Sequence, residues 1–270
     1  MAGMTAAAFR LKAEALFRAR IRSARTDLAT FIETCGQDEE GSPVVLDYIH
    51  RAWIWHIHYC WSRGLFAMIQ APMESGKSSS LVAPLAAWLI GLNPKVRIKV
   101  VCNGDALAEK RVAATKRIIE SAAYKAVFPW VRPGPKWSTM EFEVAGKPPS
   151  LDATMQARGV RSKGVGLRAD YIIFDDVCDQ LNTREEAVRN DTKLIVRQTW
   201  LTRIAKPHGR CLWIATPWHN ADATNDLMHD HRFCTLVQRV RVPDLEWYEQ
   251  ELYNGDVEEY RAGMMPTPAA

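Results

Sequence analysis

The nine residues 70–78, with the sequence QAPMESGKS, constrain the fold of this chain more than any other segment. They match a phosphate-binding loop in which Ala71 stands where the strict pattern has its first glycine. The apolar run 65–69 predicts a buried strand before the loop, and the run 79–90 predicts a helix after it. Such a loop directs consecutive backbone N–H groups at one point, where the helix dipole reinforces them. The segment therefore predicts a nucleotide-binding site rather than an ordinary turn with an exposed lysine.

Phosphate chemistry suggests a role for several residues of this loop. Gly76 lets the backbone approach a phosphate, Lys77 can reach the β- and γ-phosphates, and the Ser78 hydroxyl can bind Mg²⁺. We therefore expect ATP and Mg²⁺ as cofactors. The residues expected to contact the nucleotide are Ala71, Pro72, Met73, Glu74, Ser75, Gly76, Lys77, Ser78 and Ser79.

Composition argues against some classes of protein without identifying a binding partner. The 270 residues carry a net charge of +4, and the pI is about 8.7. That balance permits a nucleic-acid partner without requiring one. No apolar run reaches about 18 residues, so we expect no membrane span. Arg and Lys recur through the first 25 residues, which predicts a basic amphipathic helix rather than a secretory signal.

Cysteine and histidine spacing gives little support for a protein-bound metal of the zinc type. None of the six cysteines forms a C-x-x-C pair, so we expect reduced and mostly buried thiols in a cytoplasm. His56 and His58 are two residues apart, and so are His229 and His231. Side chains at that spacing do not share a helix face.

Helical and apolar segments alternate along the chain, which predicts an α/β fold. The predicted strands are 65–70, 96–102, 151–156, 171–174, 211–215 and 234–240. The predicted helices are 6–34, 46–62, 78–91, 105–121, 183–204 and 222–229. Segment 123–150 is rich in Pro, Gly and Trp and is expected to be irregular, with room for one hairpin. The pattern favours a P-loop NTPase of the RecA-like type, with a mostly parallel central sheet flanked by helices and additional N-terminal helices.

The segment YIIFDD, residues 171–176, predicts a central strand that ends in two acids. Open α/β sheets place their ligands at the carboxyl ends of such strands. In a phosphate-loop enzyme, Asp175 would hold Mg²⁺ through water, and Asp176 would orient and deprotonate the attacking water. Taken alone the two acids could equally cap a strand, but the phosphate loop about a hundred residues earlier favours the catalytic interpretation.

The segment LWIATPWHN, residues 212–220, predicts a third strand ending in a polar turn. Thr216 stands where a hydroxyl could sense the γ-phosphate or the attacking water. An ordinary strand-to-helix connection explains the position equally well.

In this order the three segments resemble the ATPase domain of the large terminase subunit of tailed bacteriophages, the motor that packages genomic DNA into a procapsid. The resemblance covers roughly residues 30–240. It also rests on DYIHRAW before the loop, AAWLIGLNPKVRIKVVCNGDALAEKRV after it, KWSTMEF and GVRSKGVGLRADYIIFDDV before the two acids, and ATPWHNADATNDLM. It implies an ATPase domain at 45–242, after an N-terminal helical segment at 1–44 and before a tail at 243–270.

The resemblance implies specific roles for five residues. Lys77 and Ser78 match the Walker A lysine and hydroxyl, and Asp175 matches the metal-binding acid of Walker B. Asp176 matches the catalytic acid, and Thr216 matches the residue that couples hydrolysis to movement.

The chain also departs from the family pattern. Many members have an arginine inside the phosphate loop, where this chain has Glu74, whose carboxylate would repel phosphate unless paired. Many also take an arginine finger from a neighbouring subunit, for which Arg158, Arg161 and Arg168 are candidates; each could instead be exposed or bind DNA. Full-length members carry a nuclease domain, and the thirty residues after Val240 are too few to form one. We therefore expect no DNA cleavage by this chain, which is either an excised domain or a natural short form.

The resemblance further implies partners: double-stranded DNA, a portal protein, a small terminase subunit, and a docked ring of identical subunits with five members. It implies a host-cytoplasmic location. DNA contacts should be to phosphates and independent of sequence. The candidate DNA contacts are Arg10, Lys12, Arg18, Arg20, Arg22, Arg25, Arg161, Lys163 and Arg168. For the N-terminal charges, a solvated helix face is an equally good interpretation.

Three alternatives compete with this interpretation. They are a helicase-like ATPase, a P-loop kinase acting on a small acceptor, and a non-catalytic assembly subunit with a relic nucleotide site.

The sequence gives only a weak indication of the residues that would bind the adenine base. His50 and Trp53 precede the loop as stacking residues might, although a tryptophan on an amphipathic helix more often belongs to the core.

Overall fold

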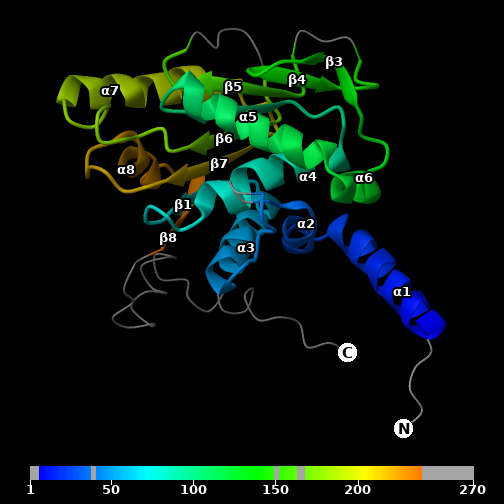
Figure 1. Ribbon diagram of the computed structural model, residues 1–270. Helices are drawn as coiled ribbons and strands as arrows, with labels where there is room; N and C mark the ends of the chain where they lie inside the picture. Colours follow the sequence, from blue (N-terminus) through cyan, green and yellow to red (C-terminus); the bar gives the residue numbers. More distant parts are fainter. Residues whose placement is uncertain (1–5, 38–40, 149–151, 163–167, 239–270) are drawn as a thin grey trace.

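An eight-stranded sheet with helices on both faces forms the body of the molecule (Figure 1). The computed structural model describes residues 6–37, 41–148, 152–162 and 168–238. The strands are β1 (Phe66–Gln70), β2 (Ile98–Cys102), β3 (Pro133–Trp137), β4 (Glu141–Val144), β5 (Met155–Gly159), β6 (Tyr171–Asp175), β7 (Arg210–Ala215) and β8 (Phe233–Val237). Their order across the sheet is β3-β4-β5-β2-β6-β7-β1-β8.

The sheet is parallel over most of its width. Every neighbouring pair from β5 to β8 is parallel, and only the β3–β4 hairpin and its contact with β5 are antiparallel. Parallel strands need both faces covered, and their residues alternate between the two faces. In β6, Ile173 belongs to one hydrophobic cluster, whereas Ile172 and Phe174 belong to the other. The predicted α/β fold with a mostly parallel sheet is confirmed.

Helices divide between the two faces of the sheet. One face is covered by α2 (Leu28–Cys35), α3 (Tyr48–Ser62), α4 (Ala83–Leu92), α5 (Asp105–Glu120) and α6 (Ala122–Val127). The helical segments of the other face are α7 (Glu186–Leu194), η2 (Ile195–Trp200), η3 (Leu201–Arg203) and α8 (Ala223–Met228). A wide helical segment, η1 (Ser78–Val82), leads directly from the phosphate loop into α4. The first helix, α1 (Ala6–Ala24), extends away from the body (Figure 1).

The main differences from the predicted elements have local causes. The helix predicted over 6–34 is broken into α1 and α2, because the Asp27 side chain accepts a hydrogen bond from the Thr30 N–H and starts a new helix. Segment 123–150 holds the expected hairpin, but it also contains α6, which the Ser121 hydroxyl caps. Strand β5 lies later than predicted because its pairing with β2 begins at Met155.

Some of the predicted features fall outside the described residues, and others are tested by them. The tail 243–270 and Lys163 lie outside the described residues, and β8 ends at Val237 rather than at residue 240. All six cysteines are free of disulfides, and all but Cys234 are buried. Within the described ranges, no helix combines the length and apolar content needed to cross a bilayer.

Candidate active site

The carboxyl ends of β1, β7 and β6 lie side by side, because these strands are parallel and neighbours in the sheet. The loop 70–78 leaves β1, Thr216 follows β7, Asp175 ends β6, and Asp176 comes directly after it. Two backbone hydrogen bonds fix this edge. The Ala71 N–H donates to the Ala215 carbonyl at 3.0 Å, and the Asp176 N–H donates to the Ile214 carbonyl at 3.0 Å. Residues far apart in the sequence thus meet at one edge of the sheet.

The backbone around this edge adopts left-handed conformations. Gly76 has a φ of +76°, which a glycine adopts without steric cost. Among the described residues, Glu74 and Asp176 are the two non-glycine residues with positive φ, at 59° and 46°, and both line the same pocket. Such strain costs free energy and clusters at binding and catalytic sites. The backbone therefore marks this edge as a functional site independently of its side chains.

Helix α3 supports the phosphate loop through His50. The His50 Nδ1 accepts the Asp47 N–H at 3.1 Å as part of the capping box of α3. Its Nε2 therefore carries the proton and donates to the Ser75 carbonyl at 3.1 Å. His50 thus holds the loop in place. Trp53 is fully buried, so its ring belongs to the core and cannot stack on a bound base.

Lys77 connects the three strand ends. It is buried, and its Nζ donates to the Pro72 carbonyl at 2.9 Å and to the Thr216 Oγ1 at 2.8 Å. The Thr216 hydroxyl donates in turn to the Asp176 Oδ1 at 3.2 Å, and the Thr216 N–H donates to the same oxygen at 3.1 Å. Burial lowers the pKa of Lys77, and the negative charges of Asp176 and Asp175 oppose that shift. A single hydrogen-bonded chain thus joins loop, β7 and β6.

Asp175 lies behind this chain and has no exposed side-chain surface. Its Oδ1 accepts from the Ser78 hydroxyl at 2.8 Å, and its Oδ2 accepts from the Arg111 Nε at 2.6 Å. Burial raises the pKa of Asp175, and the guanidinium of Arg111 opposes that shift. A hydroxyl and a carboxylate at this separation are hard oxygen donors of the kind Mg²⁺ prefers beside phosphate. The donor set at Ser78 and Asp175 therefore fits Mg²⁺.

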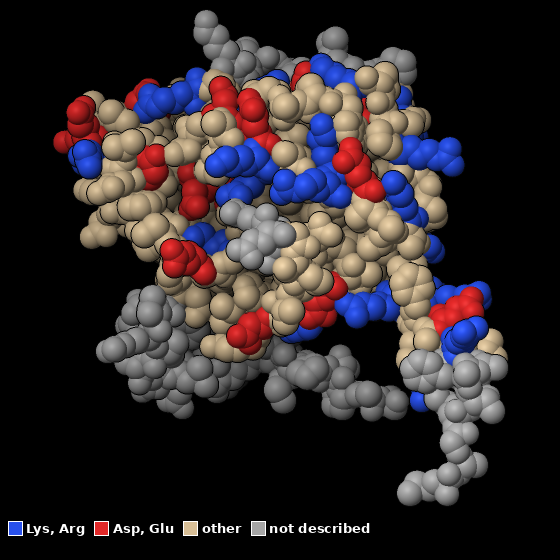
Figure 2. Space-filling view, viewed as in Figure 1, with Lys and Arg blue, Asp and Glu red and all other residues tan. Residues whose placement is uncertain are grey.

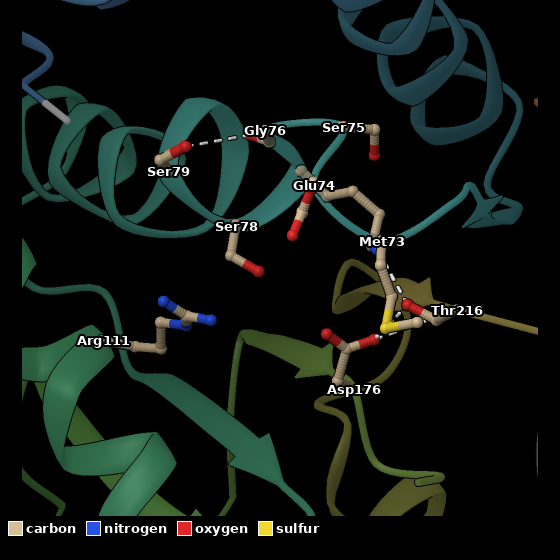
Figure 3. Close-up of a pocket in the computed structure, with 10 residues that line it drawn as sticks. Met73, Glu74, Ser75, Gly76, Ser78, Ser79, Arg111, Asp176 and Thr216 are labelled. Atoms are coloured by element: carbon tan, nitrogen blue, oxygen red, sulfur yellow. Dashed lines mark hydrogen bonds between the residues drawn. The ribbon is translucent and has the colours of Figure 1, made fainter. Parts of the chain in front are cut away.

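A pocket of about 370 Å³ opens above these groups. Figure 3 shows Arg111 and Asp176 pointing into it from opposite sides, with Ser78 and Glu74 between them. The residues that line it are Met73, Glu74, Ser75, Gly76, Lys77, Ser78, Ser79, Arg111, Asp176 and Thr216. Of the expected loop residues, Ala71 and Pro72 do not line it, since they hold the base of the loop.

Comparisons with known proteins agree with the motifs. No family model matches the chain. The large terminase subunit of Enterobacteria phage T3 is 23% identical over 194 residues, which are 70% of this chain and 32% of that protein. This chain is thus similar in sequence to a phage large terminase. The crystal structure of the HK97 bacteriophage large terminase matches its fold with a TM-score of 0.55 at 14% identity, over 90% of this chain and 52% of that one. The chain thus spans about a third of the T3 large terminase and half of the HK97 one.

The candidate arginine fingers lie apart from the pocket. Arg168 precedes β6 and lies at the amino edge of the sheet, in a hollow with Arg97 and Lys206, so it does not reach the pocket of its own chain. Arg161 follows β5, and its guanidinium contacts Asp191 and, at 3.1 Å, the Thr192 hydroxyl. Arg158 donates to the Ala157 carbonyl. None of the three arginines is among the residues that line the pocket.

Sequence reasoning did not find Arg111, which the structure brings into the pocket. The signal was present in α5. Its buried residues include Ala108, Val112 and Thr115, so Arg111 occupies the inward side of an amphipathic helix. An arginine on that side, near the carboxyl end of β2, is next to the edge that carries the acids of β6.

Proposed function

We propose that this chain binds ATP with Mg²⁺ at the carboxyl edge of its sheet and hydrolyses it to drive double-stranded DNA into a viral procapsid. The observation that carries the ATPase proposal is the hydrogen-bonded chain from Lys77 through Thr216 to Asp176. It links a phosphate-binding cation to an acid suited to act on water. Kinship with the phage large terminases supports the packaging role.

Each group of the site has a definite task in this mechanism. The loop N–H groups and Lys77 hold the phosphates, with Lys77 exchanging the Pro72 carbonyl for phosphate oxygens. Ser78 and Asp175 hold Mg²⁺, Asp175 through water. When bound, Mg²⁺ neutralises charge on the β- and γ-phosphate oxygens. Asp176 orients the attacking water and accepts its proton. Catalysis of this kind rests on positioning and electrostatics.

Thr216 is suited to couple hydrolysis to movement. Its hydroxyl touches both Lys77 and Asp176, so loss of the γ-phosphate changes the surroundings of both of its partners. Because Thr216 follows β7 directly, a shift of its hydroxyl passes to the turn that leads into α8.

The N-terminal helix is the proposed DNA-contacting element. Arg10, Lys12, Arg18 and Arg22 of α1 are exposed. Arg20 instead donates to the Thr34 hydroxyl, and Arg25 donates to the Val127 carbonyl. The last two hold α1 and the segment after it against the body, which narrows the DNA-binding set.

The assembled motor is also part of the proposal. We propose that five copies form a ring in the host cytoplasm on a portal protein, with a small terminase subunit, and that a neighbouring copy completes each site with an arginine. An arginine supplied in this way increases turnover by about 10³ to 10⁵. A lone chain should therefore be a slow ATPase.

The test is ATP hydrolysis by the purified chain and by Lys77→Ala, across protein concentration, with and without double-stranded DNA. The proposal predicts turnover that requires Lys77, rises more than linearly with concentration and increases with DNA. Turnover indifferent to Lys77 removes the catalytic assignment. Stimulation by a small phosphoryl acceptor instead of DNA would favour a kinase.

A further inference from the structure

Arg111 is the one cation besides Lys77 among the residues that line the pocket. Its side chain is only 15% exposed, and its Nε donates to the Asp175 Oδ2 at 2.6 Å. None of the sequence motifs assigns it a role. Its place is nevertheless specific, because it reaches the expected metal-binding acid from α5, an element separate from the phosphate loop and from β6.

The balance of charges in the pocket suggests that Arg111 helps to neutralise a bound triphosphate. Its lining contains two cations, Lys77 and Arg111, and two acids, Glu74 and Asp176. The loop carries Glu74 where many large terminases carry an arginine, so the loop itself offers Lys77 alone. A nucleoside triphosphate brings several negative charges, and Arg111 is the nearest additional group that can balance them within the same chain.

Both carboxylate oxygens of Asp175 already accept a hydrogen bond, one from the Ser78 hydroxyl and the other from the Arg111 Nε. Each oxygen can accept a second hydrogen bond, so a Mg²⁺-bound water would share the Oδ2 with Arg111 or displace it. Arg111 has a long side chain with several rotatable bonds, which allows it to leave Asp175.

We propose that Arg111 exchanges partners during the cycle: it holds Asp175 when the site lacks a triphosphate, and turns to the γ-phosphate when Mg²⁺ takes Asp175. This inference rests on the proposed function. The guanidinium already points into the pocket opposite Asp176 (Figure 3). Its fork of N–H donors matches phosphate oxygens. After hydrolysis and phosphate release, Arg111 returns to Asp175, so the residue distinguishes ATP from ADP in cis.

Exposed basic residues near Arg111 provide a control variant for a test of its role. Lys and Arg side chains gather over α5 (Figure 2), where Lys110 and Arg117 are exposed. A general attraction of anions to this surface would also favour the more highly charged AMP-PNP over ADP, so its contribution has to be measured separately. Lys110→Ala removes one positive charge next to Arg111 in the sequence without removing the contact to Asp175, and is the matched control.

The experiment is calorimetric titration of the full chain with Mg²⁺ and either AMP-PNP or ADP. Arg111→Ala should weaken AMP-PNP binding by about tenfold or more, as expected for one charge-assisted contact, and ADP binding by less than about twofold. Arg111→Lys, which retains a cation for Asp175 in the empty site, should lie between. Lys110→Ala should change neither affinity by more than about twofold. Equal losses for both nucleotides, or no loss, in Arg111→Ala would overturn the exchange.

The same titrations separate this inference from the proposed function. Failure of the wild-type chain to bind either nucleotide removes both. Binding that depends on Lys77, combined with unchanged AMP-PNP selectivity in the Arg111 variants, removes the exchange alone. If Arg111→Ala does not fold, Arg111→Lys decides: AMP-PNP selectivity equal to that of the wild type contradicts the exchange, because a lysine lacks the fork geometry.

Discussion

Among the described residues of the sheet, the buried lysines Lys77 and Lys99 have different surroundings, and Lys77 lines a pocket. At the carboxyl edge, Lys77 is 5% exposed, and across the middle strands Lys99 is 3% exposed. Lys99 donates to the Gln156 Oε1 at 2.7 Å, and Gln156 donates to the Glu141 Oε2 at 2.6 Å, which ties β2 to β5 and β4. The Lys77 group instead opens onto a pocket.

The difference shows which observations identify a site. Burial lowers the pKa of Lys77, and it lowers the pKa of Lys99 to about 8, so a shifted lysine pKa does not separate the two groups. The Lys77 group is distinguished by a pocket and by left-handed backbone at Glu74 and Asp176. We infer that the Lys99 group stabilises the fold and that the Lys77 group acts on a ligand.

The largest expected effect is on turnover. Asp176→Asn should lower ATP hydrolysis by about 10³-fold, because general-base assistance is lost. Asparagine tolerates the left-handed backbone and can still accept from Thr216, so the free energy of unfolding should change by less than about 1 kcal/mol. Steady-state hydrolysis and urea unfolding measure both quantities. Glu186→Gln, an exposed acid on α7, is the control. Turnover retained in Asp176→Asn would contradict the assignment of the base.

For the Lys99 group, we expect a loss of stability without a loss of nucleotide binding. Lys99→Ala should lower the free energy of unfolding by about 3 kcal/mol, because it leaves Gln156 and the nearby Asp152 without a buried cation. Nucleotide affinity should stay within about twofold. Urea unfolding and titration with ADP test the pair of expectations. If Lys99→Ala lowered the free energy of ADP binding as much as the free energy of unfolding, the Lys99 group could not be called purely structural.

Acid should destabilise the protein through His56, which is fully buried between α3 and the sheet. Burial lowers its pKa to about 4, from an ordinary value of 6.5. Between these values the unfolded chain binds the proton and the folded chain does not, so stability is complete above 6.5 and falls toward pH 4. The free energy of unfolding should drop by about 2 kcal/mol between pH 7.5 and pH 5 from this group alone.

The matched variant for this expectation is His56→Gln. Its unfolding free energy should depend less steeply on pH over the same interval, whatever its stability at pH 7.5. The exposed residue His208 supplies the control variant His208→Gln, whose slope is measured beside that of the wild type. An unaltered slope in His56→Gln would show that other groups cause the acid sensitivity.

The smallest expected effect on turnover is at Thr216, whose hydroxyl lies between Lys77 and Asp176. Thr216→Val keeps the shape of the side chain but removes the hydroxyl that joins Lys77 to Asp176. Hydrolysis should fall by about tenfold, corresponding to about 1.4 kcal/mol. The measurement is turnover at saturating ATP beside Thr202→Val, an exposed threonine on η3. Wild-type turnover in Thr216→Val would exclude the hydroxyl from the mechanism.

Much of the fold followed from local patterns in the sequence. The strand, loop and helix around residues 70–78 were predictable because glycine, lysine and serine at fixed spacing follow an apolar strand and precede a helix. The meeting of Lys77, Asp175 and Thr216 followed from placing each at the carboxyl end of a parallel strand. The break between α1 and α2 was harder to see, because Asp27 is one of many polar residues and only its bond to the Thr30 N–H makes it a cap.

The arginines show what sequence reasoning leaves open. Arg168 is a candidate for an arginine supplied to a neighbouring subunit, and its place before β6, at the opposite edge of the sheet from the pocket of its own chain, does not test that role. Arg111 was overlooked because its role depends on how α5 packs beside β2. Strand order, which decides whether β2 lies next to β6, comes from long-range pairing. No local pattern in the sequence encodes it.

The most direct test of the account is hydrogen–deuterium exchange along the chain, with and without AMP-PNP and Mg²⁺. We predict slower exchange at the backbone N–H groups of residues 73–79 and around Asp176 and Thr216, and no such change in Lys77→Ala. A larger hollow of about 470 Å³ at the amino edge, near Arg97, Arg168 and Lys206, provides the competing location. Protection at that hollow, or protection of the loop that persists without Lys77, would contradict the assignment of the nucleotide site.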